Sequence, residues 1–286
     1  MIKALRNNWP EYLMEAWGLG TFMVIACIGT AVLWHPESPV EHWVGDSPYL
    51  QRWLMGVAMG LTAIFIVYSK WGKRSGAHIN PALTLTFLRL GKIKPWDALF
   101  YVIFQFSGAI AGVAISWLLL GSVISMPQVN FAVTVPGSAG VWTAFVAEML
   151  ISAGIMGTVL FASNNPKIMN LTGVIIGCLL VLYITFEAPM SGMSMNPART
   201  VGSAAVANQW TDLWVYFAAP AIGMLAAAEI YLWTKGKDMI HCAKLHHTMD
   251  VRCIFCGFDP EMMDSEMNTE KETEKETEAP KTVQLK

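Results

Sequence analysis

Two matching segments decide the fold: Ser75-Gly-Ala-His-Ile-Asn-Pro-Ala82 and Ser191-Gly-Met-Ser-Met-Asn-Pro-Ala198. Asn is a preferred helix N-cap and Pro a preferred first helical residue, so each Asn-Pro-Ala predicts the start of a helix. The apolar stretches that follow end near Arg89 and Ala207, and both are too short to cross a bilayer. Each segment therefore predicts a half-helix that begins inside a membrane.

The composition is that of a membrane protein. Hydrophobic residues make up 54% of the 286-residue chain and charged residues only 14%, more apolar content than a soluble core of this size holds. Six apolar stretches reach the roughly 20 residues that a membrane-spanning helix needs. They are residues 13–34, 50–69, 98–120, 141–162, 171–189 and 213–233. The formal net charge of -2, without a basic face, argues against nucleic acid as a partner.

The loops between these spans differ in charge, and the difference predicts their orientation. Lys and Arg gather before the first span, between the second and third, and after the sixth, and cytoplasmic loops retain such charge. The loop at residues 35–49 has acidic residues but no Lys or Arg, and the loop at 121–140 carries no charge. We therefore predict a multi-pass protein of the cell membrane with both termini in the cytoplasm. Arg199 then stands out as a lone cation on the outer side.

The chain divides into two matching halves of three spans each. Glu15 in the first span has a counterpart in Glu148 of the fourth. An odd number of spans per half inserts the second copy upside down, and such inverted repeats carry their functional site at the bilayer midplane. The predicted fold class is an all-α membrane protein with six transmembrane helices and two re-entrant half-helices. The expected parts are a cytoplasmic N-terminus (1–9), a first repeat (10–125), a second repeat (126–235), a cytoplasmic Cys/His segment (236–258) and a disordered acidic tail (259–286).

The two opposed half-helices predict which solutes a passage between them would admit. Asn80 and Asn196 are expected side by side at its centre, where each side-chain oxygen caps its own helix and the amide N–H groups face the lumen. Two helix N-termini also place positive dipole ends there, which opposes cations and protons. The extended segments before them are expected to line the lumen with backbone carbonyls. These residues are Gly76, Ala77, His78, Ile79, Gly192, Ser194 and Met195.

Three buried polar side chains have more than one interpretation. Glu15 and Glu148 are intramembrane carboxylates, which are costly unless paired. We favour structural bracing, in which each accepts backbone N–H groups of the nearby half-helix loop, over a proton relay, because the sequence offers no chain of titratable partners. His78 either touches the lumen or forms a hydrogen bond within its loop.

With these motifs and Arg199 in place, the sequence resembles the major intrinsic protein family, the aquaporins and glycerol facilitators, over roughly residues 10–233. The resemblance implies a right-handed six-helix bundle with two half-helices. It also implies a homotetramer in the lipid bilayer, with one pore in each subunit. The function that it implies is passive passage of water and small uncharged solutes.

The resemblance also places a second constriction at four positions, one of them the Arg after the second Asn-Pro-Ala. The others correspond to Met193, to Ile184 and to Gly60, or to Met59 if the loop after span two carries a one-residue insertion. Water-selective members usually have an aromatic residue in span two and His in span five, and this sequence has neither. An opening wider than a strict water filter is therefore expected. Yet Arg199 is followed by Thr as in water channels, so we predict that water crosses and that glycerol is a second candidate solute.

Other classes of protein share parts of this pattern. A secondary transporter also uses inverted repeats and broken helices, but it needs a coupling site beside the half-helix ends. A membrane structural protein is a third class with this architecture. An enzyme is disfavoured because no nucleophile, acid and base come together, and no cofactor is expected in the pore.

The segment after the last span offers soft metal ligands. A tetrahedral zinc site needs four of them, and Cys242, one of His246 or His247, Cys253 and Cys256 would suffice. Of the two histidines, we take His246 as the candidate. The Cys-x-x-Cys spacing favours zinc, whereas the upstream half departs from the usual zinc patterns. A juxtamembrane segment with free thiols is the alternative.

Overall fold

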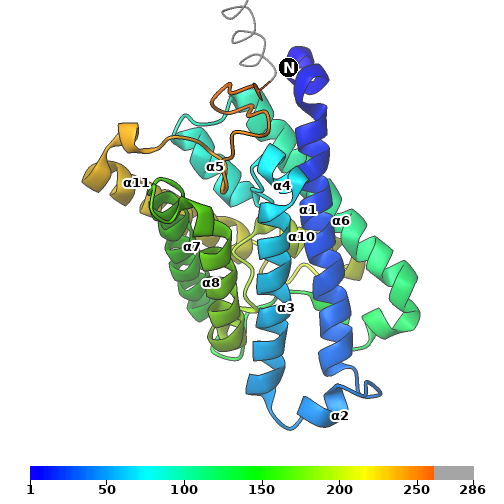
Figure 1. Cartoon of the computed structure of the whole chain (residues 1–286). Coiled ribbons are helices and arrows are strands. Elements are labelled where there is room, and N and C mark those ends of the chain that lie inside the picture. Colours follow the sequence, from blue (N-terminus) through cyan, green and yellow to red (C-terminus); the bar gives the residue numbers. More distant parts are fainter. Residues whose placement is uncertain (261–286) are drawn as a thin grey trace, which may run out of the picture.

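The computed structural model describes residues 1–260, so the predicted disordered tail lies almost entirely outside the described residues. The described part is built from helices joined by turns (Figure 1). Six of its helices are long and apolar enough to cross a membrane, which confirms the predicted number of spans. They are α1 (Ile2–Trp34), α3 (Pro48–Tyr68), α6 (Pro95–Leu120), α7 (Val141–Ser163), α8 (Thr172–Phe186) and α11 (Val215–Lys235). The spans of α6 and α8 include the adjoining 3-10 turns and cover Pro95–Ser125 and Met169–Phe186.

The first helix begins earlier than predicted. Residues 1–9 were expected as a separate N-terminus, but α1 already includes Ile2 and continues through Pro10. The extension is held against α6, because Tyr12 Oη and Asn8 Nδ2 both donate to Asp97 Oδ1, at 2.6 and 2.9 Å. Polar contacts across two helices are not visible in a hydropathy pattern, which explains the difference.

Two short helices are the expected half-helices, α5 (Pro81–Arg89) and α10 (Pro197–Ala207). Asn80 Oδ1 accepts from Ala82 N at 2.9 Å, and Asn196 Oδ1 accepts from Ala198 N at 3.0 Å, so each Asn caps its own helix. The helix α5 packs on α11, and α10 packs on α6. Each half-helix therefore packs against a span of the opposite half, which ties the two repeats together.

The spans pack as pairs: α1 on α6 and α7 on α11 within the halves, and α3 on α8 between them. Small residues allow the backbones to approach closely. A Cβ at Gly108 would lie 2.5 Å from the Cα of Ala16, and one at Gly223 would lie 2.2 Å from the carbonyl oxygen of Met149. Neither contact has room for a larger side chain.

Short elements complete the described fold. These are α2 (Glu41–Val44), α4 (Lys70–Ser75), η1 (Gly121–Ser125), η2 (Asn130–Ala132), η3 (Met169–Leu171), α9 (Ala188–Ser191) and η4 (Lys237–Met239). The predicted fifth span ran to residue 189, but α8 ends at Phe186 and α9 follows it.

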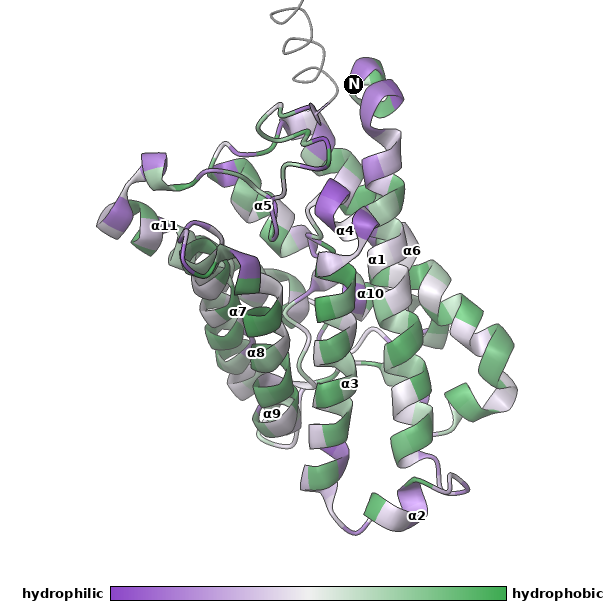
Figure 2. Ribbon diagram, viewed as in Figure 1, coloured by the Kyte–Doolittle hydropathy of each residue, from purple (hydrophilic) through white to green (hydrophobic). Residues whose placement is uncertain are grey.

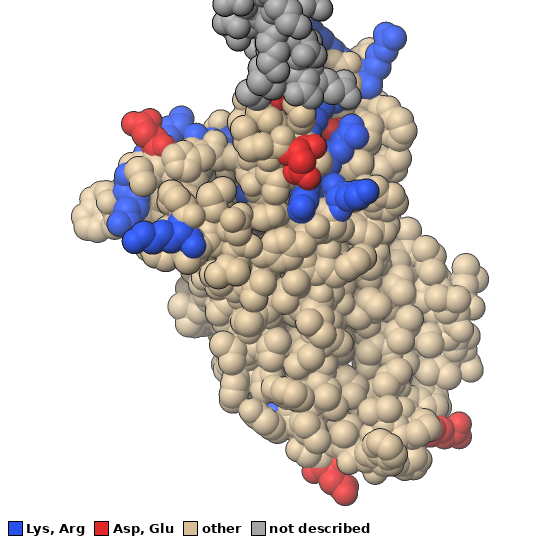
Figure 3. Space-filling view, in the orientation of Figure 1, with Lys and Arg blue, Asp and Glu red and all other residues tan. Residues whose placement is uncertain are grey.

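Charge and hydropathy divide the surface into a belt and two ends. The bundle is apolar along its length (Figure 2). In the view of Figure 3, Lys and Arg gather, together with some acidic side chains, at the end where the N-terminus lies, and the charged side chains at the opposite end are mainly acidic. The wide band between them is almost free of charge. With six apolar spans, this is an integral, multi-pass membrane protein.

Candidate functional site

The two half-helices meet at Asn80 and Asn196. Asn80 Nδ2 donates to the carbonyl of Met195 at 2.8 Å, and Asn196 Nδ2 donates to the carbonyl of Ile79 at 2.7 Å. A side-chain amide has two N–H donors, so one donor of each Asn binds the opposite half and one is left. Both asparagines line a cavity at the centre of the bundle. The expectation that both donors face the lumen is thus reduced to one donor per residue.

The segments before the half-helices share an unusual backbone. Left-handed conformations at non-glycine residues cost about 1–3 kcal/mol each and persist only where the surroundings impose them. The positive φ angles are at Gly76 (94°), Ala77 (55°), Ile79 (39°), Gly192 (80°), Met193 (51°) and Met195 (54°). The same pattern occurs at matching positions of both segments, which is the local sign of the repeat.

Glu15 and Glu148 hold these strained segments in place. Both side chains are fully buried. Glu15 accepts from Ser75 Oγ at 2.8 Å, His78 N at 3.0 Å, Ile79 N at 2.5 Å and Gln105 Nε2 at 2.9 Å. Glu148 accepts from Ser191 Oγ at 2.7 Å and from Ser194 N and Met195 N, each at 2.6 Å. Charge-assisted bonds to backbone N–H groups offset burial of a carboxylate, and this geometry favours bracing over a proton relay.

A pair of tyrosines, which the sequence analysis missed, completes the symmetry. Tyr101 Oη donates to the carbonyl of Ser75 at 2.7 Å, and Tyr216 Oη donates to the carbonyl of Ser191 at 2.5 Å. Both are fully buried. The signal was present, because each Tyr lies seven residues before a glycine of its span, Gly108 or Gly223.

Two cavities lie along the bundle and share part of their lining. The outer cavity, at the end opposite the N-terminus, has a volume of about 440 Å³, and the inner cavity, at the asparagines, has about 90 Å³. Both are lined by Phe22, Leu180, Ser194 and Arg199. We call these four residues the neck. Phe22, an aromatic residue of span one, thus belongs to the neck, although it was not among the positions expected at the second constriction.

Arg199 is anchored in the neck through one nitrogen. Its Nη1 donates to the carbonyl of Ala132 at 2.8 Å and to Thr134 Oγ1 at 3.3 Å. These acceptors come from the loop between α6 and α7, where Asn130, Phe131 and Ala132 all have positive φ. A loop from between the two halves thus orients the cation.

Not all of the other expected filter positions line a cavity. Met59, Ile184 and Met193 line the outer cavity. Gly60 does not belong to the lining of either cavity. It faces α8 instead, because a Cβ built on Gly60 would lie 2.6 Å from the carbonyl oxygen of Gly177. Of the two alternatives in span two, Met59 is the one that lines a cavity.

Two further expectations need correction. Gly76 was expected to line the lumen, but its carbonyl accepts from Leu245 N at 3.1 Å and it is outside the lining of both cavities.

Arg199 was expected to be the lone outer cation, but Arg52 also lines the outer cavity and donates from Nε to the carbonyl of Thr185 at 2.9 Å. Arg52 was overlooked because it lies inside an apolar stretch that was counted as a span.

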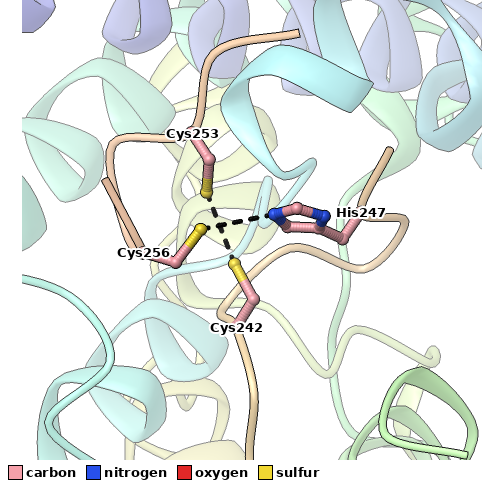
Figure 4. Close-up of side chains that lie close together, drawn as sticks. All are labelled: Cys242, His247, Cys253 and Cys256. Carbon is pink, nitrogen blue, oxygen red and sulfur yellow. Dashed lines mark hydrogen bonds between the residues drawn. The ribbon is translucent and has the colours of Figure 1, made fainter. Parts of the chain in front are cut away.

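The C-terminal segment brings four soft ligands together. The ligand atoms of Cys242, His247, Cys253 and Cys256 all lie within 4.8 Å of one another (Figure 4). The expected histidine, His246, is not among them, because its ring packs against Tyr68 with 4.9 Å between centroids. The thiol of Cys242 lies 3.4 Å from that of Cys253, and this hydrogen bond lowers the pKa of Cys253 and raises the pKa of Cys242.

Six spans and two capped half-helices that meet at paired asparagines define a membrane protein of inverted-repeat architecture. Residues 3–231 match the model of the family described as Major intrinsic protein, and the chain belongs to that family. The resemblance seen in the sequence is thereby confirmed.

Individual relatives and one solved structure agree with this assignment. The chain is 36% identical over 184 residues to a probable aquaporin NIP-type of Nicotiana alata, covering 64% of this chain and 66% of that protein. It is 35% identical over 228 residues to aquaporin NIP1-2 of Arabidopsis thaliana, covering 77% and 73%. The chain thus spans just under two thirds of the first of these relatives. The solved aquaglyceroporin of Plasmodium falciparum has the same fold, with a TM-score of 0.69 at 18% identity, covering 82% of this chain and all of that one.

Proposed function

We propose that the protein is a passive transmembrane channel for water and for small neutral solutes such as glycerol, and that it excludes protons and ions. The observation that carries this proposal is the pairing of Asn80 and Asn196 at two opposed helix N-termini in the inner cavity. Each amide keeps one N–H donor, so a water molecule at this point accepts hydrogen bonds from the asparagines. Its orientation then prevents a continuous chain of donors along the row of water molecules in the passage. The two positive dipole ends oppose a cation at the same point.

The lining of the outer cavity supports a range of neutral solutes. Met59, Ile184 and Met193 offer apolar walls, while Arg199 offers a fixed cation in the neck. A solute that combines a carbon skeleton with hydroxyl groups matches both surfaces. The names of the compared proteins, aquaporins and an aquaglyceroporin, are in keeping with water and glycerol as substrates.

A secondary transporter is the alternative, and the position of the carboxylates disfavours it. Coupling needs a titratable or ion-binding group that the passage can reach. Glu15 and Glu148 are fully buried, bind the backbone of their loops and do not belong to the lining of either cavity. Passive flux through the passage requires no cofactor and no catalytic step.

The orientation and assembly form part of the proposal. The end that carries the N-terminus and the Lys and Arg side chains would face the cytoplasm of a cell membrane, by the rule that cytoplasmic loops retain positive charge (Figure 3). We propose a homotetramer because the family resemblance implies one. Mass measurement of the purified protein in a defined detergent tests the assembly.

Stopped-flow light scattering of vesicles tests the function. Vesicles with the protein should shrink faster than protein-free lipid under an impermeant osmolyte, and they should re-swell in glycerol but not in a charged solute of similar size. Water flux equal to that of lipid, both in the protein as purified and after treatment with a metal chelator, would refute the channel, and fast water flux with glycerol excluded would restrict it to water. Flux that saturates or depends on an ion gradient would favour the transporter.

A further inference from the structure

The C-terminal segment at residues 240–258 lies directly on the inner half-helix loop. The carbonyl of Ala243 lies 2.8 Å from His78 Nε2, and Leu245 N donates to the carbonyl of Gly76 at 3.1 Å. Leu245 itself lines the inner cavity. In Figure 1 the segment, coloured orange, passes over α4 and α5 at the end that carries the N-terminus. It thus covers the inner end of the proposed passage.

An aromatic stack reinforces this contact. The ring of Phe255 is stacked on His78, with 5.4 Å between centroids and an angle of 8°, and it meets Tyr101 edge-on at 5.9 Å. A Cβ at Gly76 would lie 2.9 Å from the Phe255 ring. For His78 the sequence left two alternatives, contact with the lumen or a hydrogen bond within its loop. His78 belongs to the lining of the inner cavity, and its ring also contacts Ala243 and Phe255.

Little regular structure holds the segment there. Residues 240–258, all within the described part, form turns and bends without a helix or strand. Their polar ties include Lys244 Nζ to the carbonyl of Arg252 at 2.9 Å and Arg252 Nη2 to Asn8 Oδ1 at 2.9 Å. Small structures with little core often use a disulfide or a metal to hold one conformation. The four-ligand cluster lies within this segment (Figure 4).

The cluster has the dimensions of a tetrahedral metal site. With Zn–S bonds of about 2.3 Å, the edges of a tetrahedral site are about 3.8 Å long. Two observed edges are 3.4 Å, between Cys242 and Cys253, and 3.3 Å, between His247 Nε2 and Cys256 Sγ. A disulfide would need two sulfurs at about 2.05 Å, and it would leave His247 without a role. Three sulfurs and one imidazole in this geometry favour zinc over Ca²⁺ or Mg²⁺.

A tight turn that ends in glycine carries Cys253 and Cys256. Gly257 N donates to the carbonyl of Cys253 at 3.0 Å, and Gly257 has a φ of 80°, so the turn of the Cys-x-x-Cys-Gly run needs glycine.

The charge around the cluster is also complementary. Zinc with three thiolates and one neutral imidazole carries a net charge of about −1. The side chain of Lys244 is buried, and its Nζ donates to the carbonyl of Arg252, the residue before Cys253. A lysine at this position complements the negative charge of such a site.

We propose that Cys242, His247, Cys253 and Cys256 bind one Zn²⁺, and that this metal holds residues 240–258 as a plug over the inner end of the passage. Loss of zinc releases Phe255 from His78 and opens the inner end. The plug depends on the proposed channel function, whereas the metal site stands without it.

Metal analysis of the purified full-length protein tests the site. Elemental analysis should find about one zinc per chain, and the paired change Cys253→Ser with Cys256→Ser should lower that content about tenfold or more. Cys178→Ser, at an exposed free cysteine outside the cluster, is the matched control and should leave it unchanged. Cobalt exchanged into the protein should show the absorption of a tetrahedral thiolate complex. Zinc at trace level in wild-type protein, or a Cys242–Cys253 disulfide found by mass spectrometry, overturns the site.

Water permeability of the same preparations tests the plug. If the open state is a minor population of about 10% or less, removal of zinc by a chelator before reconstitution should raise the permeability about tenfold, and added ZnCl₂ should restore it. Phe255→Ala should raise permeability while the zinc content stays the same. Zinc-loaded and zinc-free channels with equal permeability overturn the plug. If every form, including Phe255→Ala, is no more permeable than lipid, the proposed channel fails, and the zinc content still decides the metal site.

Discussion

Asn80 Nδ2 donates to the carbonyl of Met195 at 2.8 Å, and Asn196 Nδ2 donates to the carbonyl of Ile79 at 2.7 Å. The two halves are therefore joined by reciprocal bonds at the point where their helices begin. Each Asn performs two tasks at once, because its oxygen caps a helix and its nitrogen binds the other half. The centre is consequently rigid, and its remaining donors have a defined direction.

Asn80→Asp should damage this centre without removing the helix cap. The carboxylate still accepts from Ala82 N, but it places a second acceptor against the carbonyl of Met195. The lost bond and the unpaired charge should cost about 1–3 kcal/mol of stability or more, and the negative charge should admit protons. Vesicles loaded with a pH-sensitive dye measure the leak. Asn208→Asp, at an exposed position, is the control, and equal proton flux in both variants would contradict the role of Asn80.

Glu148→Gln should destabilise the fold more than a comparable surface change. Glutamine can replace one carboxylate oxygen, so an N–H of Ser194 or Met195 faces an NH₂ group instead of an acceptor. The expected loss is about 3 kcal/mol. The control is Glu229→Gln, because Glu229 is half exposed and forms a surface ion pair with Arg89 at 2.8 Å, worth about 0–1 kcal/mol. Thermal unfolding in detergent measures both, and equal melting temperatures would argue against bracing.

Much of the fold could be predicted because its signals are local. Six spans follow from apolar length, and the two half-helices follow from an Asn cap and a Pro at the first helical position. The repeat made Glu15 and Glu148 equivalent before any contact was known. These features depend on neighbours in sequence or on internal symmetry, and both can be read without coordinates.

The site was less predictable where it depends on contacts between distant segments. The choice between Met59 and Gly60 depends on which side of α3 faces α8, and a one-residue shift changes it. The selection of His247 over His246 depends on the path of an irregular segment. The contact between Phe255 and His78 joins residues far apart in the chain, so no local pattern could indicate it.

Arg199→Ala should relax selectivity more than Arg52→Ala. Arg199 lies in the neck and lines both cavities, whereas Arg52 lines the outer cavity and is outside the lining of the inner one. Loss of Arg199 removes the cation in the neck, so larger or cationic solutes should pass while water flux persists. Solute-exchange and conductance measurements on vesicles compare the two variants. If both variants had equal selectivity, or if Arg199→Ala still excluded larger and cationic solutes, the neck would not determine selectivity.

Met59→Ala and Gly60→Ala should affect different properties, although the residues are adjacent. Met59→Ala shortens an apolar wall of the outer cavity, so glycerol flux should rise relative to water flux. Gly60→Ala places a Cβ 2.6 Å from the carbonyl oxygen of Gly177, and such overpacking costs about 1–3 kcal/mol. It should therefore lower the melting temperature and leave the ratio of glycerol to water flux unchanged. A change in that ratio in Gly60→Ala at unchanged stability would place Gly60, and not Met59, at the filter.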